Sequence, residues 1–276
     1  MGSIIGSGQY RYRVDDTWAA ADAASRGELS GVACDRRGRV YLCSRRPQPK
    51  VLVYEADGTA VGSWGQDVFA HVDGPHGISV AAEDAVYVTD IHAHVVYHFT
   101  TAGVLVRTIG TPGSPGQAGQ PFNMPTKAVV GPDGDLYVAD GYGQNRVHRF
   151  SPSGELLASW GSPGDGPGQF DLPHSIGVDA RGQVWVADRE NGRAQVFDTA
   201  GAFLRQHRLA HANNVAIDDE QNVYIGADIL DADGNILAHC EDYWGHSVSV
   251  APNGDLYWTH VAAPNRLRKY VRVREA

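Results

Sequence analysis

The sequence predicts an all-β fold, a six-bladed β-propeller whose ring is closed by pairing of the N- and C-terminal strands. Two observations predict this fold: one segment pattern occurs six times along the chain, and its apolar residues alternate with a period of two. No segment of ten or more residues has a convincing helical period, and only 19–25 could form a single helical turn. A propeller arranges four-stranded antiparallel blades around a central channel.

Each repeat consists of a short apolar strand, a tight polar turn and a second apolar strand centred on an aromatic residue. These aromatic residues, which we call the anchors, are Tyr41, Tyr87, Tyr137, Trp185, Tyr224 and Tyr257. The anchors are separated by between 33 residues (Tyr224 to Tyr257) and 50 residues (Tyr87 to Tyr137), which is typical of propeller blades. Most repeats continue with a second hairpin, as in 54–65 and 150–161, whose turn glycine supplies a positive φ. The pattern therefore predicts two hairpins per blade.

The two ends of the chain indicate how the ring closes. The sixth repeat stops after about three strands, whereas 9–16 alternates like a strand and has no hairpin partner of its own. Pairing 9–16 beside the C-terminal strand would complete the last blade and remove two exposed sheet edges. We therefore expect one propeller domain over residues 1–276.

Composition limits the partners and the compartment. Lys plus Arg number 23 and Asp plus Glu number 32, a net charge of −9, which argues against a nucleic acid or an anionic membrane as the main partner. No apolar run approaches the roughly 20 residues that span a bilayer, and the N-terminus does not resemble a signal peptide. Three scattered cysteines do not make a disulfide framework. We expect a cytoplasmic protein, and the sequence leaves its oligomeric state unknown.

One position in each repeat, eleven residues before the anchor, lies at the start of the innermost strand. These six positions, the mouth slots, hold Ser30, His76, Thr126, His174, Asn213 and His246. Histidine occupies only repeats two, four and six, so the three imidazoles should lie about 120° apart and converge on the channel axis. Neutral imidazoles are preferred ligands of zinc, and three of them leave an open position for catalysis. The alternative is that these histidines cap strands or fill the channel.

Residues just after the anchor should face the same mouth, because the second strand returns to the end where the first began. Arg45 and Arg189 lie four residues after their anchors, and Tyr142 lies five residues after its own. Two guanidiniums suggest an anionic, carboxylate-bearing substrate, and the tyrosine is a candidate general acid or base. Taken singly, an arginine in such a loop is usually solvated or in a salt bridge, and a tyrosine there usually packs against its neighbours.

Other candidates are weaker. His92 and His94 lie near the mouth and could compete as ligands, but other repeats have no counterpart. The aspartates three residues after the anchor recur too regularly to be catalytic, and we expect them to bind backbone amides: Asp90, Asp140 and Asp188. Cys34 lies on an apolar strand, where a buried and inert thiol is expected.

The segments 75–99, 125–161 and 173–197 resemble NHL-repeat propellers and, more narrowly, the catalytic core of peptidylglycine α-amidating lyases. The strings VADGYxxxR and VADRENGR carry most of this similarity, which covers roughly 28–275. The resemblance implies an axial zinc held by three histidines, an active-site tyrosine and two active-site arginines. These functions fall on His76, His174, His246, Tyr142, Arg45 and Arg189.

The sequence also departs from that family. Asn123 and Gly143 stand where the family has a disulfide. The third histidine lies in Trp244-Gly245-His246-Ser247, where the family has Met-Pro-His-Asp. The missing aspartate corresponds to a ligand of the family's structural Ca²⁺, so calcium is doubtful here. The change at Trp244 lies near the pocket and could alter the substrate.

The resemblance implies a zinc-dependent lyase that cleaves an α-hydroxyamide to an amide and an α-oxo acid such as glyoxylate. The zinc would act as a Lewis acid on the substrate hydroxyl or carboxylate. Tyr142 or a zinc-bound hydroxide would take the proton, while Arg45 and Arg189 orient the carboxylate. Two alternatives stay open: a metal-dependent hydratase, hydrolase or lyase acting on another small carboxylate-bearing metabolite, and a non-catalytic NHL-repeat binding scaffold.

Overall fold

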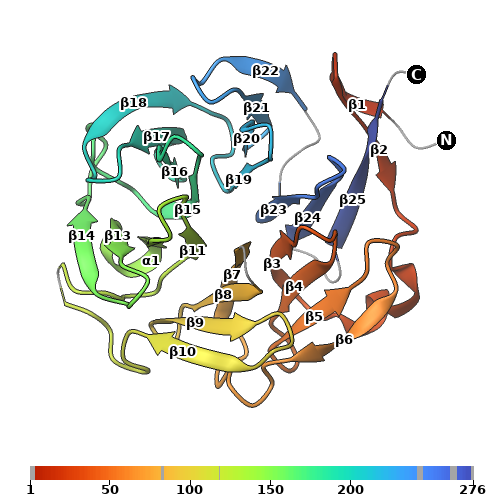
Figure 1. Ribbon diagram of the computed structural model, residues 1–276, viewed down its shortest axis with the longest axis horizontal. Helices are drawn as coiled ribbons and strands as arrows, with labels where there is room; N and C mark the ends of the chain where they lie inside the picture. The colour runs from red at the N-terminus through yellow and green to blue at the C-terminus, as the bar shows by residue number, and fades with distance from the viewer. Residues whose placement is uncertain (1–3, 82–83, 118, 241–244, 262–265, 275–276) are drawn as a thin grey trace.

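Six antiparallel sheets surround one central axis in the computed structural model (Figure 1), which describes residues 4–81, 84–117, 119–240, 245–261 and 266–274. In every sheet the first strand of the repeat lies innermost. Each innermost strand contacts the innermost strands of the two neighbouring sheets, so the ring is complete. The predicted six-bladed propeller is confirmed.

Blades 1 to 5 each contain four strands in sequence order from the axis outward. Blade 1 contains β3 (Leu29–Cys34), β4 (Val40–Ser44), β5 (Lys50–Tyr54) and β6 (Ala60–Trp64). Blade 2 contains β7 (Pro75–Ala81), β8 (Ala85–Asp90), β9 (Val95–Thr100) and β10 (Leu105–Ile109). Blade 3 contains β11 (Lys127–Val130), β12 (Leu136–Asp140), β13 (Arg146–Phe150) and β14 (Leu156–Trp160). Blade 4 contains β15 (Pro173–Val178), β16 (Val184–Asp188), β17 (Arg193–Phe197) and β18 (Phe203–Arg208). Blade 5 contains β19 (Val215–Ile217), β20 (Val223–Ile225), β21 (Asp228–Leu230) and β22 (Ile236–His239).

Blade 6 joins the two ends of the chain, as the lone alternating segment near the N-terminus predicts. Its strands are β23 (Ser247–Val250), β24 (Leu256–His260), β25 (Arg266–Val273), β2 (Tyr10–Asp15) and β1 (Ile4–Ser7). β2 pairs antiparallel with β25, with Tyr12 opposite Arg272, and the two strands lie side by side at the upper right of Figure 1. The fifth strand, β1, was not foreseen from the sequence. It forms a hairpin with β2 and covers the edge that β2 would otherwise expose.

The two helical segments are short. The 3₁₀ helix η1 (Ala20–Ser25) lies within the segment where one helical turn is expected. The second, α1 (Gly141–Gln144), follows β12 directly and ends at Asn145, whose left-handed backbone (φ 56°) stops the helix. This turn carries Tyr142 and therefore sets where that side chain lies.

The anchors form the core between blades. All six are buried, and each contributes about 1.5–3 kcal/mol through burial of its ring. Four of them also bond to an aspartate in the turn of their own inner hairpin: Asp35 to Tyr41, Asp133 to Tyr137, Asp179 to Trp185 and Asp218 to Tyr224. The aspartates accept these hydrogen bonds, which tie the hairpin turn to the blade core.

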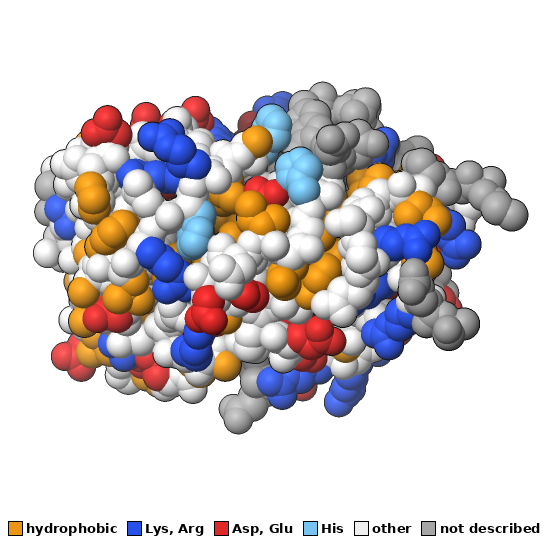
Figure 2. Space-filling view, turned by 90° about the horizontal axis from the view of Figure 1, so that it is seen from above, with side chains coloured by type: hydrophobic (Ala, Val, Ile, Leu, Met, Phe, Trp, Pro, Cys, Tyr) orange, Lys and Arg blue, Asp and Glu red, His pale blue; other side chains and the backbone are white. Residues whose placement is uncertain are grey.

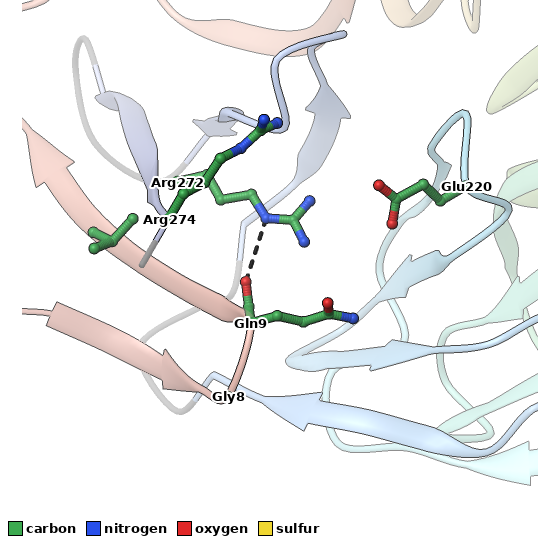
Figure 3. Close-up of a pocket in the computed structure, with 6 residues that line it drawn as sticks. Gly8, Gln9, Glu220, Arg272 and Arg274 are labelled. Atoms are coloured by element: carbon green, nitrogen blue, oxygen red, sulfur yellow. Dashed lines mark hydrogen bonds between the residues drawn. The ribbon is translucent and has the colours of Figure 1, made fainter. Parts of the chain in front are cut away.

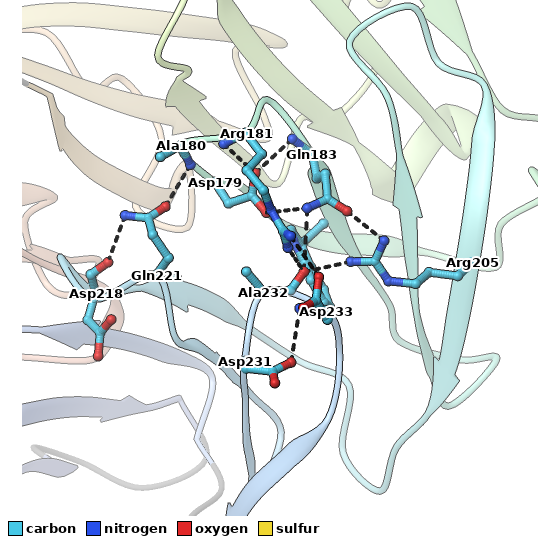
Figure 4. Close-up of polar contacts among 11 residues, drawn as sticks. Asp179, Ala180, Arg181, Gln183, Arg205, Asp218, Gln221, Asp231, Ala232 and Asp233 are labelled. Carbon is cyan, nitrogen blue, oxygen red and sulfur yellow. Dashed lines mark hydrogen bonds and ion pairs between the residues drawn. The ribbon is translucent and has the colours of Figure 1, made fainter.

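Polar groups join blades 4 and 5 at the end of the channel opposite the mouth slots (Figure 4). Arg181, in the β15–β16 turn, forms an ion pair of 2.7 Å with Asp233 in the β21–β22 turn. Arg205 on β18 donates to the Gln183 side chain at 2.5 Å and to the Ala232 carbonyl at 2.9 Å. These contacts hold the shortest-stranded blade, blade 5, against its neighbour.

The surface carries charges of both signs. Figure 2 shows Lys and Arg side chains interspersed with Asp and Glu across one side of the propeller. Among the described residues, no helix has the length and apolar character needed to cross a bilayer.

Candidate metal centre

The three mouth-slot histidines converge on the channel axis. His76 lies in β7, His174 lies in β15, and His246 immediately precedes β23. One ring nitrogen from each lies within 4.8 Å of the other two. Their ring centroids are 4.7 to 5.0 Å apart, although the residues come from three blades far apart in the sequence.

Each imidazole is oriented by a backbone carbonyl of the next blade around the ring. The Nδ1 atoms donate to carbonyl oxygens at 2.7, 2.5 and 2.6 Å: His76 to Thr126, His174 to Asn213 and His246 to Ser30. A carbonyl can only accept, so Nδ1 carries the proton in all three rings and the lone pair lies on Nε2. Such a bond fixes the tautomer and the ring orientation of a metal-binding histidine.

The surroundings keep these rings neutral. Burial, together with the neighbouring histidines, holds the pKa of His76 well below its usual range. Burial and the charges of nearby groups likewise depress the pKa of His174, while burial lowers the pKa of His246 to about 4. Neutral imidazole is the form that binds metal ions.

The donor set fits a divalent transition metal. His174 Nε2 is buried and has no hydrogen-bond partner among the described residues, which is costly for a polar atom unless a ligand covers it. Three neutral imidazoles with a fixed tautomer suit Zn²⁺ and leave a fourth coordination position open. The described residues therefore offer three ligands that could hold a metal ion.

Tyr142 lies beside the histidines, as the repeat alignment predicts. Its hydroxyl donates to His76 Nε2 at 3.2 Å, and its ring packs edge-on against His76 and His174. The Arg189 guanidinium lies 5.8 Å from the centroid of the Tyr142 ring. α1 thus brings a hydroxyl to the nitrogen that would bind a metal.

The two predicted arginines lie near enough to affect the histidines electrostatically. Arg45 Nε donates to the Pro75 carbonyl at 3.0 Å, next to His76, and Arg45 Nη1 lies 3.5 Å from a Glu28 carboxylate oxygen. Arg189 Nε bonds to Glu190 at 2.7 Å. Burial is the main cause of the low pKa values of His174 and His246, and the positive charges of Arg45 and Arg189 lower them further.

The weaker candidates lie outside this cluster. The His92 ring packs against His71 with centroids 5.7 Å apart, and His94 Nδ1 accepts the Met124 N–H at 3.1 Å. The regularly spaced aspartates bind backbone N–H groups as expected: Asp90 those of His92 and Ala93, Asp140 that of Asn123, and Asp188 that of Asp171. Cys34 is a free thiol that is half-buried rather than fully buried as expected, and the burial of its sulfur raises its pKa to about 12.

The departures from the amidating lyases can be located in part. Asn123 and Gly143 are neighbours, since a Cβ added at Gly143 would lie 2.4 Å from Asn123 Cγ. The asparagine side chain thus fills the space where a disulfide is expected in that family. Trp244, expected near the pocket, lies outside the described residues.

Two residues near the centre were missed from the sequence. His260 ends β24, and its charge contributes to lowering the pKa of His246. It stands three residues after its anchor, where blades 2, 3 and 4 have aspartate, and that exception could have revealed it. Lys127 lines the channel with the three histidines. The equivalent residues in the other blades are glycine, serine or asparagine.

A larger cavity of about 510 Å³ lies away from the histidines, between blades 5 and 6 (Figure 3). Gln9, Glu220, Arg272 and Arg274 line it, and Arg272 donates to the Gln9 carbonyl at 3.3 Å. None of the predicted site residues lines this cavity, so its size does not make it the chemical centre.

Comparison with known proteins identifies the repeat. The NHL repeat family model matches residues 122–150 and 170–197, which cover the three inner strands of blades 3 and 4. This chain is an NHL-repeat propeller. Streptogramin B lyase has the same fold, with a TM-score of 0.66 over 96% of this chain and 99% of that one, at 12% identity.

Two curated relatives are similar in sequence. Human NHL repeat-containing protein 3 is 38% identical over 200 residues, covering 68% of this chain and 56% of that protein. Peptidyl-alpha-hydroxyglycine alpha-amidating lyase 1 of Drosophila melanogaster is 34% identical over 189 residues, covering 63% of this chain and 34% of that protein. The propeller thus spans about half or less of the length of these relatives. The predicted likeness to the amidating lyases is confirmed.

Proposed function

We propose that this propeller is a zinc-dependent lyase that cleaves an α-hydroxyamide to an amide and an α-oxo acid such as glyoxylate. The observation that carries the proposal is the meeting, at one mouth, of three neutral histidines with Tyr142, Arg45 and Arg189. The similarity to the Drosophila amidating lyase supports the reaction class. NHL repeats alone do not require such a cluster, which favours an enzyme over a binding scaffold.

His76, His174 and His246 hold the metal through Nε2. Zinc bound there supplies Lewis-acid chemistry, which lowers the pKa of a substrate hydroxyl. The carbonyl bonds to Nδ1 keep the three rings oriented while the substrate binds.

Arg45 and Arg189 bind the substrate carboxylate through charge-assisted hydrogen bonds and so orient the hydroxyl-bearing carbon. The Tyr142 oxygen takes up the proton of the substrate hydroxyl as general base and passes it to the leaving nitrogen as general acid. The C–N bond breaks, and its electron pair goes to the amide nitrogen. The hydroxyl-bearing carbon becomes the aldehyde of glyoxylate, so the step is redox-neutral and consumes no water.

We propose a small anionic molecule as the partner, because Arg45 and Arg189 provide a local positive site. The net charge of −9 argues against nucleic acid or an anionic membrane as the partner. We also propose a cytoplasmic location. Its support is chemical: Cys34, Cys43 and Cys240 are free thiols, and Asn123 and Gly143 occupy the expected disulfide positions.

The test is to incubate zinc-loaded protein with α-hydroxyhippurate and to measure benzamide and glyoxylate. We expect both products in equal amounts. Tyr142→Phe should lower kcat by about 10²- to 10⁴-fold, while Arg189→Gln should chiefly raise KM. Arg181→Gln, on the opposite face, is the control and should leave both constants unchanged.

Zinc binding without either product would reject the amidating-lyase reaction. Screening the same protein with small lactones and hydroxy acids would then test the hydrolase and hydratase alternatives. A protein that binds no metal, and whose histidine variants behave like wild type, would instead be a binding scaffold.

A further inference from the structure

A single lysine interrupts the small residues that line the channel. One residue beyond each mouth slot, five blades have a glycine, serine or asparagine: Gly31, Gly77, Ser175, Asn214 and Ser247. Blade 3 has Lys127 at this position, the first residue of β11. A long cation therefore projects from a position where the other blades present little or no side chain.

The Lys127 side chain crosses the channel. Its Nζ donates to the carbonyl of Val215 at 2.6 Å. Val215 begins β19 in blade 5, whereas Lys127 belongs to blade 3, and β15 of blade 4 packs between the two strands. A side chain from blade 3 reaches blade 5 by passing across the channel that the innermost strands enclose (Figure 1).

Little room remains beside this side chain. The cavity lined by Lys127 and the three histidines has a volume of about 10 Å³, no more than one water molecule needs. Burial lowers the pKa of Lys127 to about 8, so the ammonium form still predominates at pH 7. The channel thus contains a positive charge of its own.

The same cavity does not fit calcium. Calcium takes six to eight oxygen ligands and prefers carboxylates. The described residues that line the cavity offer hydroxyl, amide, imidazole and ammonium groups but no carboxylate. Ser247 stands where the amidating lyases have a calcium-ligating aspartate, so the carboxylate that calcium prefers is missing at that position too.

We propose that the Lys127 ammonium joins blade 3 to blade 5 in place of a calcium ion and makes this propeller independent of calcium. The proposal concerns the frame of the ring and holds whatever reaction the mouth catalyses.

The first experiment counts metals. Full-length, zinc-loaded protein is equilibrated with excess CaCl₂, transferred to a volatile buffer and weighed by native mass spectrometry, and its melting temperature is measured with and without calcium. We expect no bound calcium and the same melting temperature in both buffers. A bound calcium ion, or a rise in melting temperature on adding calcium, would overturn the proposal.

The second experiment tests the lysine with matched variants. Lys127→Met leaves the Val215 carbonyl without its donor and should lower the melting temperature by roughly 2 to 10 °C. Lys127→Arg keeps the positive charge, so its melting temperature should fall less than that of Lys127→Met. Lys50→Met, at the start of β5 in blade 1, is the control and should melt near wild type.

Equal melting temperatures for Lys127→Met and Lys50→Met would contradict the proposal. If Lys127→Met does not fold, a folded Lys127→Arg supports the need for a cation. If Lys127→Met and Lys127→Arg behave alike, the positive charge is not what matters, and this result argues against the proposal. None of these readouts depends on lyase activity, so they are separable from a failure of the proposed reaction.

Discussion

Alternate blades do different work at the mouth of this propeller. Blades 2, 4 and 6 each provide an imidazole, whereas blades 1, 3 and 5 each provide the backbone carbonyl that orients it. The second set also holds the residue before each histidine. Ser30 and Thr126 donate side-chain hydroxyls to the carbonyls of Pro75 and Pro173, both at 2.8 Å. Each supporting blade therefore contacts both of its neighbours: its carbonyl orients the histidine of one neighbour, and its side chain holds the residue before the histidine of the other.

Blade 5 departs from this scheme. Its contact to the residue before a histidine comes from Asn214, one position after the mouth slot, whose Nδ2 donates to the Gly245 carbonyl at a longer 3.3 Å. The blade also has the shortest inner strands, β19 and β20. We infer that blade 5 supports the residue before His246 less firmly than blades 1 and 3 support the residues before His76 and His174.

The largest effect should follow from removing a ligand. His174→Ala leaves two imidazoles at the centre, and we expect the zinc content to fall from about one per chain to almost none. His98→Ala, which removes a ring stacked on Tyr87 away from the centre, is the control. Elemental analysis of both variants decides the matter, and zinc retained in full by His174→Ala would refute the three-histidine site.

Acid should destabilise the metal-free protein through the same residues. The pKa values of His76, His174 and His246 are lower in the folded protein than the usual value near 6.5. The unfolded chain therefore binds protons first as the pH falls. The stability that the neutral rings contribute is complete above about pH 6.5 and is lost as the pH falls toward 4.

The loss should reach at most about 1.4 kcal/mol per pH unit for each histidine. Urea unfolding of metal-free protein at several pH values measures it, with the triple His→Gln variant as the reference. The prediction is wrong if wild type and the triple variant show the same pH dependence.

The sequence predicts the ligand blades better than the supporting ones. Histidine is a distinct residue type, so its alternation with Ser30, Thr126 and Asn213 is visible once the anchors are aligned. The carbonyls that accept from the histidines are present in every residue and leave no trace in the sequence. The reach of Lys127 to Val215 was also invisible, because it depends on the width of the channel rather than on spacing along the chain.

A smaller effect is expected at a supporting hydroxyl. Thr126→Val keeps the side-chain shape but removes the bonds from Oγ1 to Pro173 and to Ala139. We expect zinc affinity to fall about tenfold and stability by about 1 kcal/mol, since the strand before His174 loses its support. Competition with a zinc chelator measures the affinity. Thr101→Val, which removes an exposed hydroxyl bonded to Asp84, serves as the control and should change neither quantity. Equal zinc affinities in the two variants would show that the hydroxyl does not support the site.

The smallest effect separates backbone from side chain within the supporting blades. Asn213 orients His174 through its backbone carbonyl oxygen, which lies 2.5 Å from His174 Nδ1. A side-chain substitution leaves this carbonyl in place unless it disturbs the backbone. Asn213→Ser should therefore keep zinc affinity within about twofold of wild type, in contrast to Thr126→Val, whose lost bonds come from the side chain. The same chelator competition compares the two variants directly. A loss at Asn213→Ser as large as that at Thr126→Val would mean that the asparagine side chain itself supports the centre, and blade 5 would then differ from blades 1 and 3 in kind rather than in strength.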